Sequence, residues 1–380
     1  MIPLSAPDIL ESDIEAVAEV LRSPRLSLGP AAEAFEHAMA RYAAVDHGIA
    51  VSSGTAGLHL CIRALNIGPG DEVLVPSFTF IAVANCVRYE QATPVFVDIE
   101  PATLNLDPEK FEDAITPRTR AIIVVHTFGC PADMDAIERI AARHNLTIIE
   151  DACEAIGAEY HERKAGSFGH AAIFAFYPNK QVTTGEGGMV VTRDAGFAAR
   201  IRALRNQGRY PSDDWFQHTE LGYNYRISEI NCVLGLRQLQ RIGSILQQRE
   251  TVARAYTQRL NGNPHLLLPP ANLPHQRISW FVYVVRLNNS FTRQQRDTIL
   301  QQLTERGIGC GRYFAPIHLQ PAYTSWRTPP SLPVTEHCAD RTIALPFFNR
   351  LSNAQTQQVC DALTSLLDKI SQAGPEEPAC

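Results

Sequence analysis

Short apolar runs alternate with helix-like stretches over residues 47–192, and this alternation restricts the fold more than any other feature of the sequence. The runs are rich in valine and isoleucine, which is typical of strands that are covered on both faces. The pattern therefore predicts an α/β fold in which a mostly parallel sheet lies between layers of helices. Seven strands are expected, at residues 49–53, 72–76, 94–98, 121–126, 147–150, 172–176 and 188–192.

The rest of the chain predicts a helical N-terminal segment and a second, smaller domain. Helices are expected at residues 11–21 and 31–42, outside the sheet, and a long helical stretch at residues 227–260 would join the two domains. The small domain is expected to be α+β, with strands at residues 280–287 and 311–314 and helices at residues 292–306 and 352–370. The expected boundaries are 1–245 for the large domain, 246–371 for the small domain and 372–380 for a disordered tail.

The composition indicates a small-molecule partner rather than nucleic acid or a membrane. Charged residues make up 19% of the 380 residues and the formal net charge is -6, so no basic surface is expected. The N-terminus lacks a targeting pattern, and no stretch is long and apolar enough to cross a bilayer. The nine cysteines are an odd number and are scattered singly, which favours reduced thiols and a cytoplasmic location.

Residues 51–57 (VSSGTAG) lead from a strand through small residues directly into an amphipathic helix. Free N–H groups at such a helix start, together with the helix dipole, form a ready anion site. An ordinary strand-to-helix turn shows the same pattern. The segment by itself leaves both interpretations open.

Two adjacent carboxylates, Glu150 and Asp151, end an apolar strand at the position where open α/β sheets bind ligands. Neighbouring residues of a strand point to opposite faces, so only one of the two can face a given ligand. A carboxylate here could bind a metal, cap a helix or pair with a cation.

His126 and Cys130 have no second ligand pair at metal-site spacing, which favours a core or loop role for both.

Only four of the 34 basic residues are lysines, and Lys180 differs from the other three in its setting. An arginine keeps its proton, whereas a lysine amine can become neutral and attack a carbonyl. Lys110, Lys164 and Lys369 have the contexts of ordinary surface lysines. Lys180 lies between an apolar strand and a glycine-rich turn, and desolvation there would favour the neutral nucleophile that a Schiff base requires.

Taken together, these segments resemble the DegT/StrS family of sugar aminotransferases, which are fold type I enzymes that use pyridoxal 5′-phosphate (PLP). The resemblance covers nearly the whole chain and includes residues 150–152 (EDA) and 176–180 (FYPNK). It implies a large PLP-binding domain and a small C-terminal domain. Further matching stretches are residues 2–5, 53–56, 68–73, 75–80, 184–188, 222–226 and 318–321.

The resemblance also implies roles for particular residues. Lys180 would carry PLP as a Schiff base and move a proton between the substrate carbon and the cofactor. Asp151 would face the pyridine nitrogen and keep it protonated, which makes the ring a better electron sink. Phe80 corresponds to the aromatic residue that stacks on the ring. The segment that holds the phosphate through its backbone would be Gly54, Thr55 and Ala56.

Two positions depart from the commonest pattern of the family. Many relatives have glutamine where this chain has Glu154, near the phenolic oxygen of the cofactor, and an ionised glutamate would repel a phenolate. Glu154 would then be protonated, turned away or bound through water. Many relatives also have a serine where this chain has Ala175, so one hydroxyl contact to the phosphate is lost. More of the anchoring would fall on backbone amides and on a partner subunit.

Asn224 and Arg226 match a loop that in relatives reaches the phosphate of the neighbouring subunit, so the resemblance implies a homodimer with shared active sites. His318 has two interpretations: a structural histidine that supports the loop before Pro321, or a residue close to the sugar substrate. Tyr313 is a second candidate for contact with the substrate.

The implied activity is a ping-pong amino transfer. An amino acid, by family habit glutamate, would convert bound PLP to pyridoxamine 5′-phosphate, which would then aminate a nucleotide-linked keto-sugar. The amino sugar would serve polysaccharide or antibiotic biosynthesis. Three alternatives remain: a sugar dehydratase, although such relatives have histidine in place of Lys180; an acceptor that is a cyclitol or another ring ketone; and a non-catalytic regulatory protein that keeps the fold.

Overall fold

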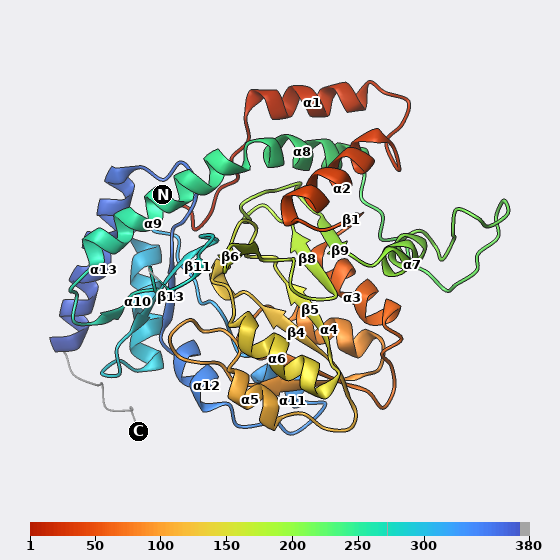
Figure 1. Ribbon diagram of the computed structural model, residues 1–380. Coiled ribbons are helices and arrows are strands. Elements are labelled where there is room, and N and C mark those ends of the chain that lie inside the picture. The colour runs from red at the N-terminus through yellow and green to blue at the C-terminus, as the bar shows by residue number, and fades with distance from the viewer. Residues whose placement is uncertain (272, 373–380) are drawn as a thin grey trace.

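A seven-stranded sheet forms the centre of the large domain, and all seven predicted strands belong to it (Figure 1). The computed structural model describes residues 1–271 and 273–372. Along the sheet the strand order is β1, β9, β8, β5, β4, β2, β3. Strand β9 is antiparallel to both of its neighbours, and the other pairs are parallel. The strands are β1 (His47–Val51), β2 (Glu72–Pro76), β3 (Thr93–Val97), β4 (Thr119–Val125), β5 (Thr147–Asp151), β8 (Ala171–Ala175) and β9 (Gly188–Thr192).

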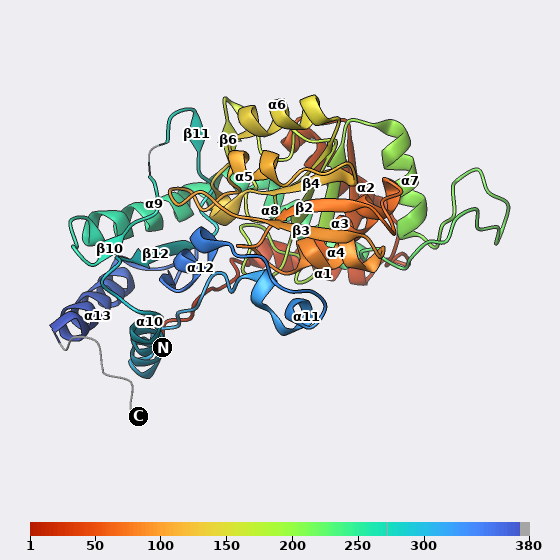
Figure 2. The ribbon, with the colours of Figure 1, turned by 90° about the horizontal axis from the view of Figure 1, so that it is seen from below.

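Helices cover both faces of this sheet, as the valine- and isoleucine-rich strands predict (Figure 2). Successive residues of a strand enter different cores: Ile123 packs with one helix layer, and Ile122 and Val124 pack with the other. The first layer contains α3 (Gly54–Ala64), α4 (Ala82–Tyr89) and α7 (Ala195–Arg205). The second contains α2 (Pro30–Ala43), α5 (Pro108–Asp113), α6 (Met134–His144) and α8 (Glu229–Gln240).

The stretch predicted as one long helix, residues 227–260, is two helices, α8 and α9 (Ile242–Leu260), with a break at Arg241. Helix α8 packs against α1 (Glu11–Leu21) and α2, whereas α9 packs against α13 (Asn353–Gln372) of the other domain. The Arg241 guanidinium binds Asp8 at 2.7 Å and Asp13 at 3.0 Å. The helix therefore breaks where its contacts pass from one domain to the other.

The small domain is built on a second core around a three-stranded sheet of β10, β12 and β13. The predicted helices form as α10 and α13. Ile2 forms a bridge with Ile308, so the start of the chain packs on this domain as well. Gln372 ends α13, and the remainder of the predicted tail, residues 373–380, lies outside the described residues. The elements are β10 (Leu266–Leu267), β12 (Tyr283–Leu287), α10 (Arg293–Glu305) and β13 (Thr342–Leu345).

The prediction of a strand at residues 311–314 is wrong. Only Gly311 pairs, as a single bridge to Ala344, and the third strand of the sheet is β13. The chain leaves the sheet because Phe314 turns its ring toward the large domain. Its ring centroid lies 5.3 Å from that of Phe128 and 5.9 Å from that of Phe78. Aromatic packing between the domains therefore replaces strand pairing.

Several short elements connect these parts. They are β6 (Glu159–Tyr160), β7 (Arg163–Lys164), β11 (Gln276–Arg277), the 3-10 helices Thr127–Gly129 and Ile317–Leu319, α11 (Pro321–Thr324) and α12 (Pro333–Ala339).

None of the helices in residues 1–271 and 273–372 is long and apolar enough to cross a membrane.

Candidate active site

A cavity of about 530 Å³ opens at the carboxyl ends of five strands of the large sheet, β1, β2, β4, β5 and β8. This is the edge at which open α/β sheets bind ligands. Residues from the C-terminal part of the chain, Phe281, Tyr313 and Phe314, close the cavity on the other side. The cavity contains seven of the predicted site residues: Gly54, Thr55, Phe80, Asp151, Glu154, Lys180 and Tyr313.

Lys180 lies on the turn that follows β8, and its side chain is only 14% exposed. The backbone N–H of Lys180 donates to the carbonyl of Tyr177 at 2.9 Å, and Thr183 and Thr184 both bond to the carbonyl of Phe176, which closes the turn. The amine Nζ lies 3.9 Å from the centre of the Phe281 ring and 3.6 Å from a carboxylate oxygen of Glu154. The turn therefore holds a primary amine inside the cavity.

The strand alternation separates the two carboxylates at the end of β5. Asp151 lines the cavity, and its Oδ1 accepts from the N–H of Cys153 at 3.0 Å. Glu150 points to the opposite side and is completely buried. Its oxygens accept from the N–H groups of Gly166, Phe168 and Gly169, each at 2.7 Å. Asp151 is thus the carboxylate that faces the cavity, and Glu150 organises the loop behind it.

His126 completes the environment of Glu150. Its Nδ1 accepts from the N–H of Ala132 at 3.1 Å, so Nε2 carries the proton that it donates to Glu150 at 3.0 Å. Burial would raise the pKa of Glu150, but the hydrogen bonds from His126 and from the loop amides outweigh it and hold that pKa below its usual range. Sequence reasoning did not assign this role to Glu150 or to His126, because their partners come from distant segments.

Glu154 is buried against the lysine. Its Oε2 accepts from the N–H of Phe128 at 2.9 Å, and its side chain is 8% exposed. Burial raises the pKa of Glu154, and the positive charge of Lys180 opposes that shift only in part. Glu154 lines the cavity beside Lys180 and is not turned away from it.

The N-terminus of α3 opens toward the same cavity. Ser53 caps this helix, and its Oγ accepts from the N–H of Ala56 at 3.1 Å. Gly54 and Thr55 occupy the first two helical positions, whose N–H groups have no partner within a helix. A Cβ on Gly54 would lie 2.8 Å from the Cβ of Ala175, so only glycine allows this close approach to β8. An anion could bind here, with Gly54 and Thr55 as donors rather than Ala56.

The remaining predicted residues lie elsewhere. The ring of His318 is buried outside the cavity, with Nδ1 at 2.6 Å from Oγ of Ser77 and Nε2 at 3.2 Å from Glu336. Asn224 is exposed, and Arg226 donates to Asn206 at 2.9 Å. In the part of the chain that the structure describes, neither Asn224 nor Arg226 lines the cavity of its own chain.

Sequence reasoning missed Arg249 and Phe281 as parts of the site. Arg249 is a buried residue of α9 that donates to the carbonyls of Trp280 and Phe281, each at 2.8 Å, and to Asn349. These bonds fix the segment that places the Phe281 ring against Lys180. An arginine in a helix with no acid three or four residues away was the available signal, but its acceptors lie in distant segments that no sequence pattern reveals.

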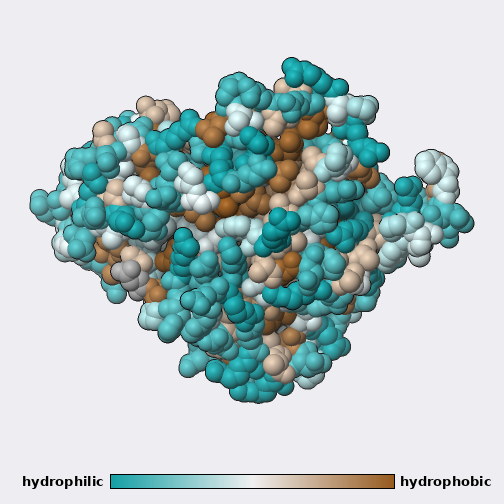
Figure 3. Space-filling model, turned by 45° about the horizontal axis from the view of Figure 1, so that its top comes forward, coloured by the Kyte–Doolittle hydropathy of each residue, from teal (hydrophilic) through white to brown (hydrophobic). Residues whose placement is uncertain are grey.

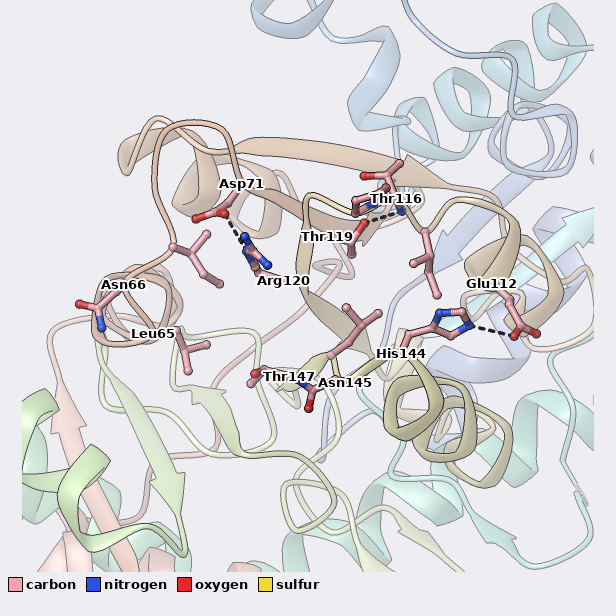
Figure 4. Close-up of a pocket in the computed structure, with 14 residues that line it drawn as sticks. Leu65, Asn66, Asp71, Glu112, Thr116, Thr119, Arg120, His144, Asn145 and Thr147 are labelled. Atoms are coloured by element: carbon pink, nitrogen blue, oxygen red, sulfur yellow. Dashed lines mark hydrogen bonds and ion pairs between the residues drawn. The ribbon is translucent and has the colours of Figure 1, made fainter.

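A second cavity, of about 710 Å³, opens among the amino ends of β2, β4 and β5 (Figure 4). It contains none of the predicted site residues. Its charged side chains pair with one another, Arg120 with Asp71 at 2.9 Å and His144 with Glu112 at 3.1 Å. Ligands of such sheets bind at the opposite edge, so the cavity around Lys180 is the candidate active site.

Comparisons with known proteins point to one family of enzymes. Residues 7–364 match the model of the DegT/DnrJ/EryC1/StrS aminotransferase family. GDP-perosamine synthase of Caulobacter vibrioides is 42% identical over 370 residues, which are 96% of this chain and 98% of the relative. DesV from S. venezuelae superposes with a TM-score of 0.87 and is 40% identical over 94% of each chain. Spr1654 from Streptococcus pneumoniae, in its PLP form, has a TM-score of 0.93 and 27% identity, over 97% of this chain and 99% of that one.

The fold and the cavity thus define a fold type I, PLP-dependent aminotransferase, in agreement with the sequence-based expectation. The chain belongs to the DegT/DnrJ/EryC1/StrS aminotransferase family.

The residues present fit the cofactor. One cavity holds an amine that can join an aldehyde, a carboxylate that can hold a proton on a ring nitrogen, and a helix N-terminus for a phosphate. The glycine at that helix start leaves the space that a Cβ would fill. No group of three or more metal-ligating side chains is found within the described ranges of the chain.

Proposed function

We propose that this enzyme transfers an amino group from an amino acid, by family habit glutamate, to a nucleotide-linked keto-sugar, with Lys180 as its catalytic lysine. The observation that carries the proposal is the Lys180 amine, which lies inside the cavity together with Asp151 and the start of α3. The sugar acceptor is supported by the 42% identity to a GDP-perosamine synthase over nearly its entire length.

The chemistry divides between the cofactor and the chain. Bound PLP supplies an electron sink at the carbon that gains or loses nitrogen. Lys180 would hold the cofactor through Nζ, and its amine, when free, would move the proton at the reacting carbon. Asp151 would keep a proton on the ring nitrogen, and the N–H groups of Gly54 and Thr55 would bind the phosphate. Phe80, which lines the cavity, would pack against the ring.

The acceptor can be tested with the loaded enzyme. We expect the holoenzyme, given L-glutamate, to aminate at least one nucleotide keto-sugar in a panel, with the product identified by mass and NMR. Free ring ketones without a nucleotide form the second arm of the panel. Amination of cyclitol ketones alone, with none of the nucleotide sugars consumed, would contradict the proposed acceptor class.

Replacement of Asp151 with asparagine is expected to lower kcat by roughly 10²–10³-fold, because an amide cannot hold the ring nitrogen in its protonated state. The matched control is Asp113→Asn, at an exposed position outside the cavity, which should leave kcat unchanged. Steady-state rates of amino transfer measure both variants. Full activity of Asp151→Asn with bound cofactor would exclude a role for this carboxylate.

We further propose a homodimer in which each chain completes the site of the other. Among the lining residues, all within the described ranges, Lys180 is the single cation, yet a phosphate and an anionic substrate need more positive charge. Asn224 and Arg226 lie outside the cavity of their own chain and are available to a partner. The rim is apolar, with Phe80 60% exposed and Tyr177 52% exposed.

Apolar groups also interrupt the hydrophilic surface on the side that carries α1 (Figure 3). At the N-cap of α1, on the helix itself and in the loop after it, the exposed apolar residues are Leu10, Ile14, Leu21, Leu26 and Leu28. Burial in a dimer would remove such groups from water.

Mixing two inactive variants tests the shared site. Lys180→Ala and Arg226→Ala, each inactive or weak alone, should regain about a quarter of the wild-type activity after subunit exchange, since half of the dimers are then mixed and each has one intact site. Size-exclusion chromatography with differently tagged chains confirms the exchange. Mixed dimers that stay inactive would show that Arg226 serves its own chain.

The cysteines are consistent with a reducing compartment. All eight that lie in the described part of the chain are free thiols. Together with the biosynthetic reaction proposed above, this supports a cytoplasmic location.

A further inference from the structure

Two glutamates four residues apart, Glu150 and Glu154, are both buried but have opposite surroundings. Glu150 accepts four hydrogen bonds, three from backbone N–H groups and one from His126, and its pKa is lowered against the effect of burial. For Glu154, the described residues supply one donor within hydrogen-bond distance, the N–H of Phe128. A buried carboxylate needs several donors or a close cation to remain ionised.

The groups that face Glu154 supply that compensation only in part. Nζ of Lys180 is 3.6 Å from Oε1, which is within ion-pair range but longer than a hydrogen bond, and its charge does not outweigh the effect of burial. Asp151 adds a second carboxylate to the same cavity and disfavours another negative charge. Two further titratable groups, Cys153 and Tyr313, have pKa values raised mainly by burial and are neutral at physiological pH.

Hydrogen-bond chemistry distinguishes the two forms of Glu154. Its Oε2 is already an acceptor for Phe128, which leaves Oε1 toward Lys180. An ionised carboxyl can only accept at Oε1, whereas a neutral one can carry a proton there and donate it. In PLP the hydroxyl stands on the ring carbon next to the one that bears the aldehyde. Its oxygen therefore lies beside the nitrogen of a lysine joined to that aldehyde, where it would meet Glu154.

We propose that Glu154 is a neutral carboxylic acid in the holoenzyme and donates its proton in a hydrogen bond to the phenolic oxygen of PLP. A neutral Glu154 has the same hydrogen-bonding capacity as a glutamine amide at this position. Its Oε2 accepts from the N–H of Phe128, and the protonated Oε1 donates. The inference rests on the proposed attachment of the cofactor to Lys180. It differs from the two other possibilities, a carboxyl turned away from the cavity and one bound to the cofactor through water.

The pH dependence follows from the sign of the shift. A raised pKa keeps Glu154 neutral above the range in which glutamates ordinarily ionise, and the donor is lost when the pH rises through the raised value. Cofactor affinity should then fall by about tenfold to a hundredfold, as expected for the loss of one hydrogen bond to a charged group. The isosteric variant Glu154→Gln keeps a hydrogen-bond donor at every pH and should lack this pH-dependent fall in cofactor affinity.

Infrared spectroscopy of the PLP-loaded enzyme tests the protonation state directly. Near neutral pH, the difference spectrum between wild type and Glu154→Gln should contain the carbonyl band of a protonated carboxyl. The matched control is Glu186→Gln, an exposed carboxylate that lines the same cavity, and its difference spectrum should contain carboxylate bands. Loss of carboxylate bands in the Glu154→Gln spectrum would overturn the proposal.

A second measurement does not depend on turnover. The dissociation constant of PLP and the absorbance of the lysine-bound cofactor are followed against pH in wild type, Glu154→Gln and Glu154→Ala. We expect the pH-dependent loss of PLP affinity in wild type alone. At pH values below that loss, Glu154→Ala should bind PLP more weakly than wild type. Identical titrations of wild type and Glu154→Gln would overturn the proposal. An absorbance that survives in Lys180→Ala would instead refute the proposed function.

Discussion

Replacing Lys180 with alanine is expected to lower amino transfer by at least about 10⁴-fold, because the variant lacks both the amine that joins the cofactor and the base that moves the proton. No second amine can take its place, since Lys180 is the one lysine that lines the described cavity. Steady-state turnover measures the loss, and the absorbance of lysine-bound cofactor should vanish with it.

The matched control for this variant is Lys369→Ala, on the exposed face of α13. It removes the same side chain without touching the cavity and should leave both turnover and absorbance unchanged. Steady-state activity that persists in Lys180→Ala would refute the assignment of Lys180, whatever the result for Lys369.

Replacing Glu150 with alanine is expected to destabilise the protein by about 3–5 kcal/mol, a large part of the net stability of a domain. The loss would leave the N–H groups of Gly166, Phe168 and Gly169, together with His126, buried without their acceptor. Urea unfolding followed by circular dichroism measures the free energy of unfolding. The control Glu15→Ala, at an exposed position of α1, should change it by less than about 0.5 kcal/mol.

The same residue makes stability depend on pH. Because the folded state lowers the pKa of Glu150, its contribution is fully present above the ordinary glutamate pKa and is lost as the pH falls through the lowered value. The difference in stability between wild type and Glu150→Ala should therefore narrow in acid. A difference that stays constant from neutral to strongly acidic pH would contradict an ionised Glu150.

The large domain was predictable because its signals are local. Strands such as β2 and β9 are buried along their whole length, so they appear in the sequence as short runs of mostly apolar residues. Lys180 stood out for a similar reason, since an isolated lysine beside an apolar strand is unusual in a chain with few lysines. The family resemblance then assigned Asp151 rather than Glu150 to the ligand side, and of the two it is Asp151 that lines the cavity.

The small domain was less predictable. Residues 311–314 have the composition of a strand, yet Phe314 packs against Phe128 and Phe78 between the domains. Strand β13, which takes the expected place in the sheet, was not predicted, and its pairing with β12 joins residues far apart in the sequence. The break at Arg241 likewise depends on Asp8 and Asp13, more than 200 residues away.

The sequence alone determined the α/β class, the order of the strands along the chain and the lysine that can form a covalent bond with a carbonyl, because periodicity and residue chemistry are local properties. Only the tertiary structure decided the opposite pKa shifts of the two glutamates. Glu150 and Glu154 are the same residue type in the same segment, but one collects four donors from distant backbone and from His126, and the other collects one. Charge in a buried site depends on partners that folding brings together.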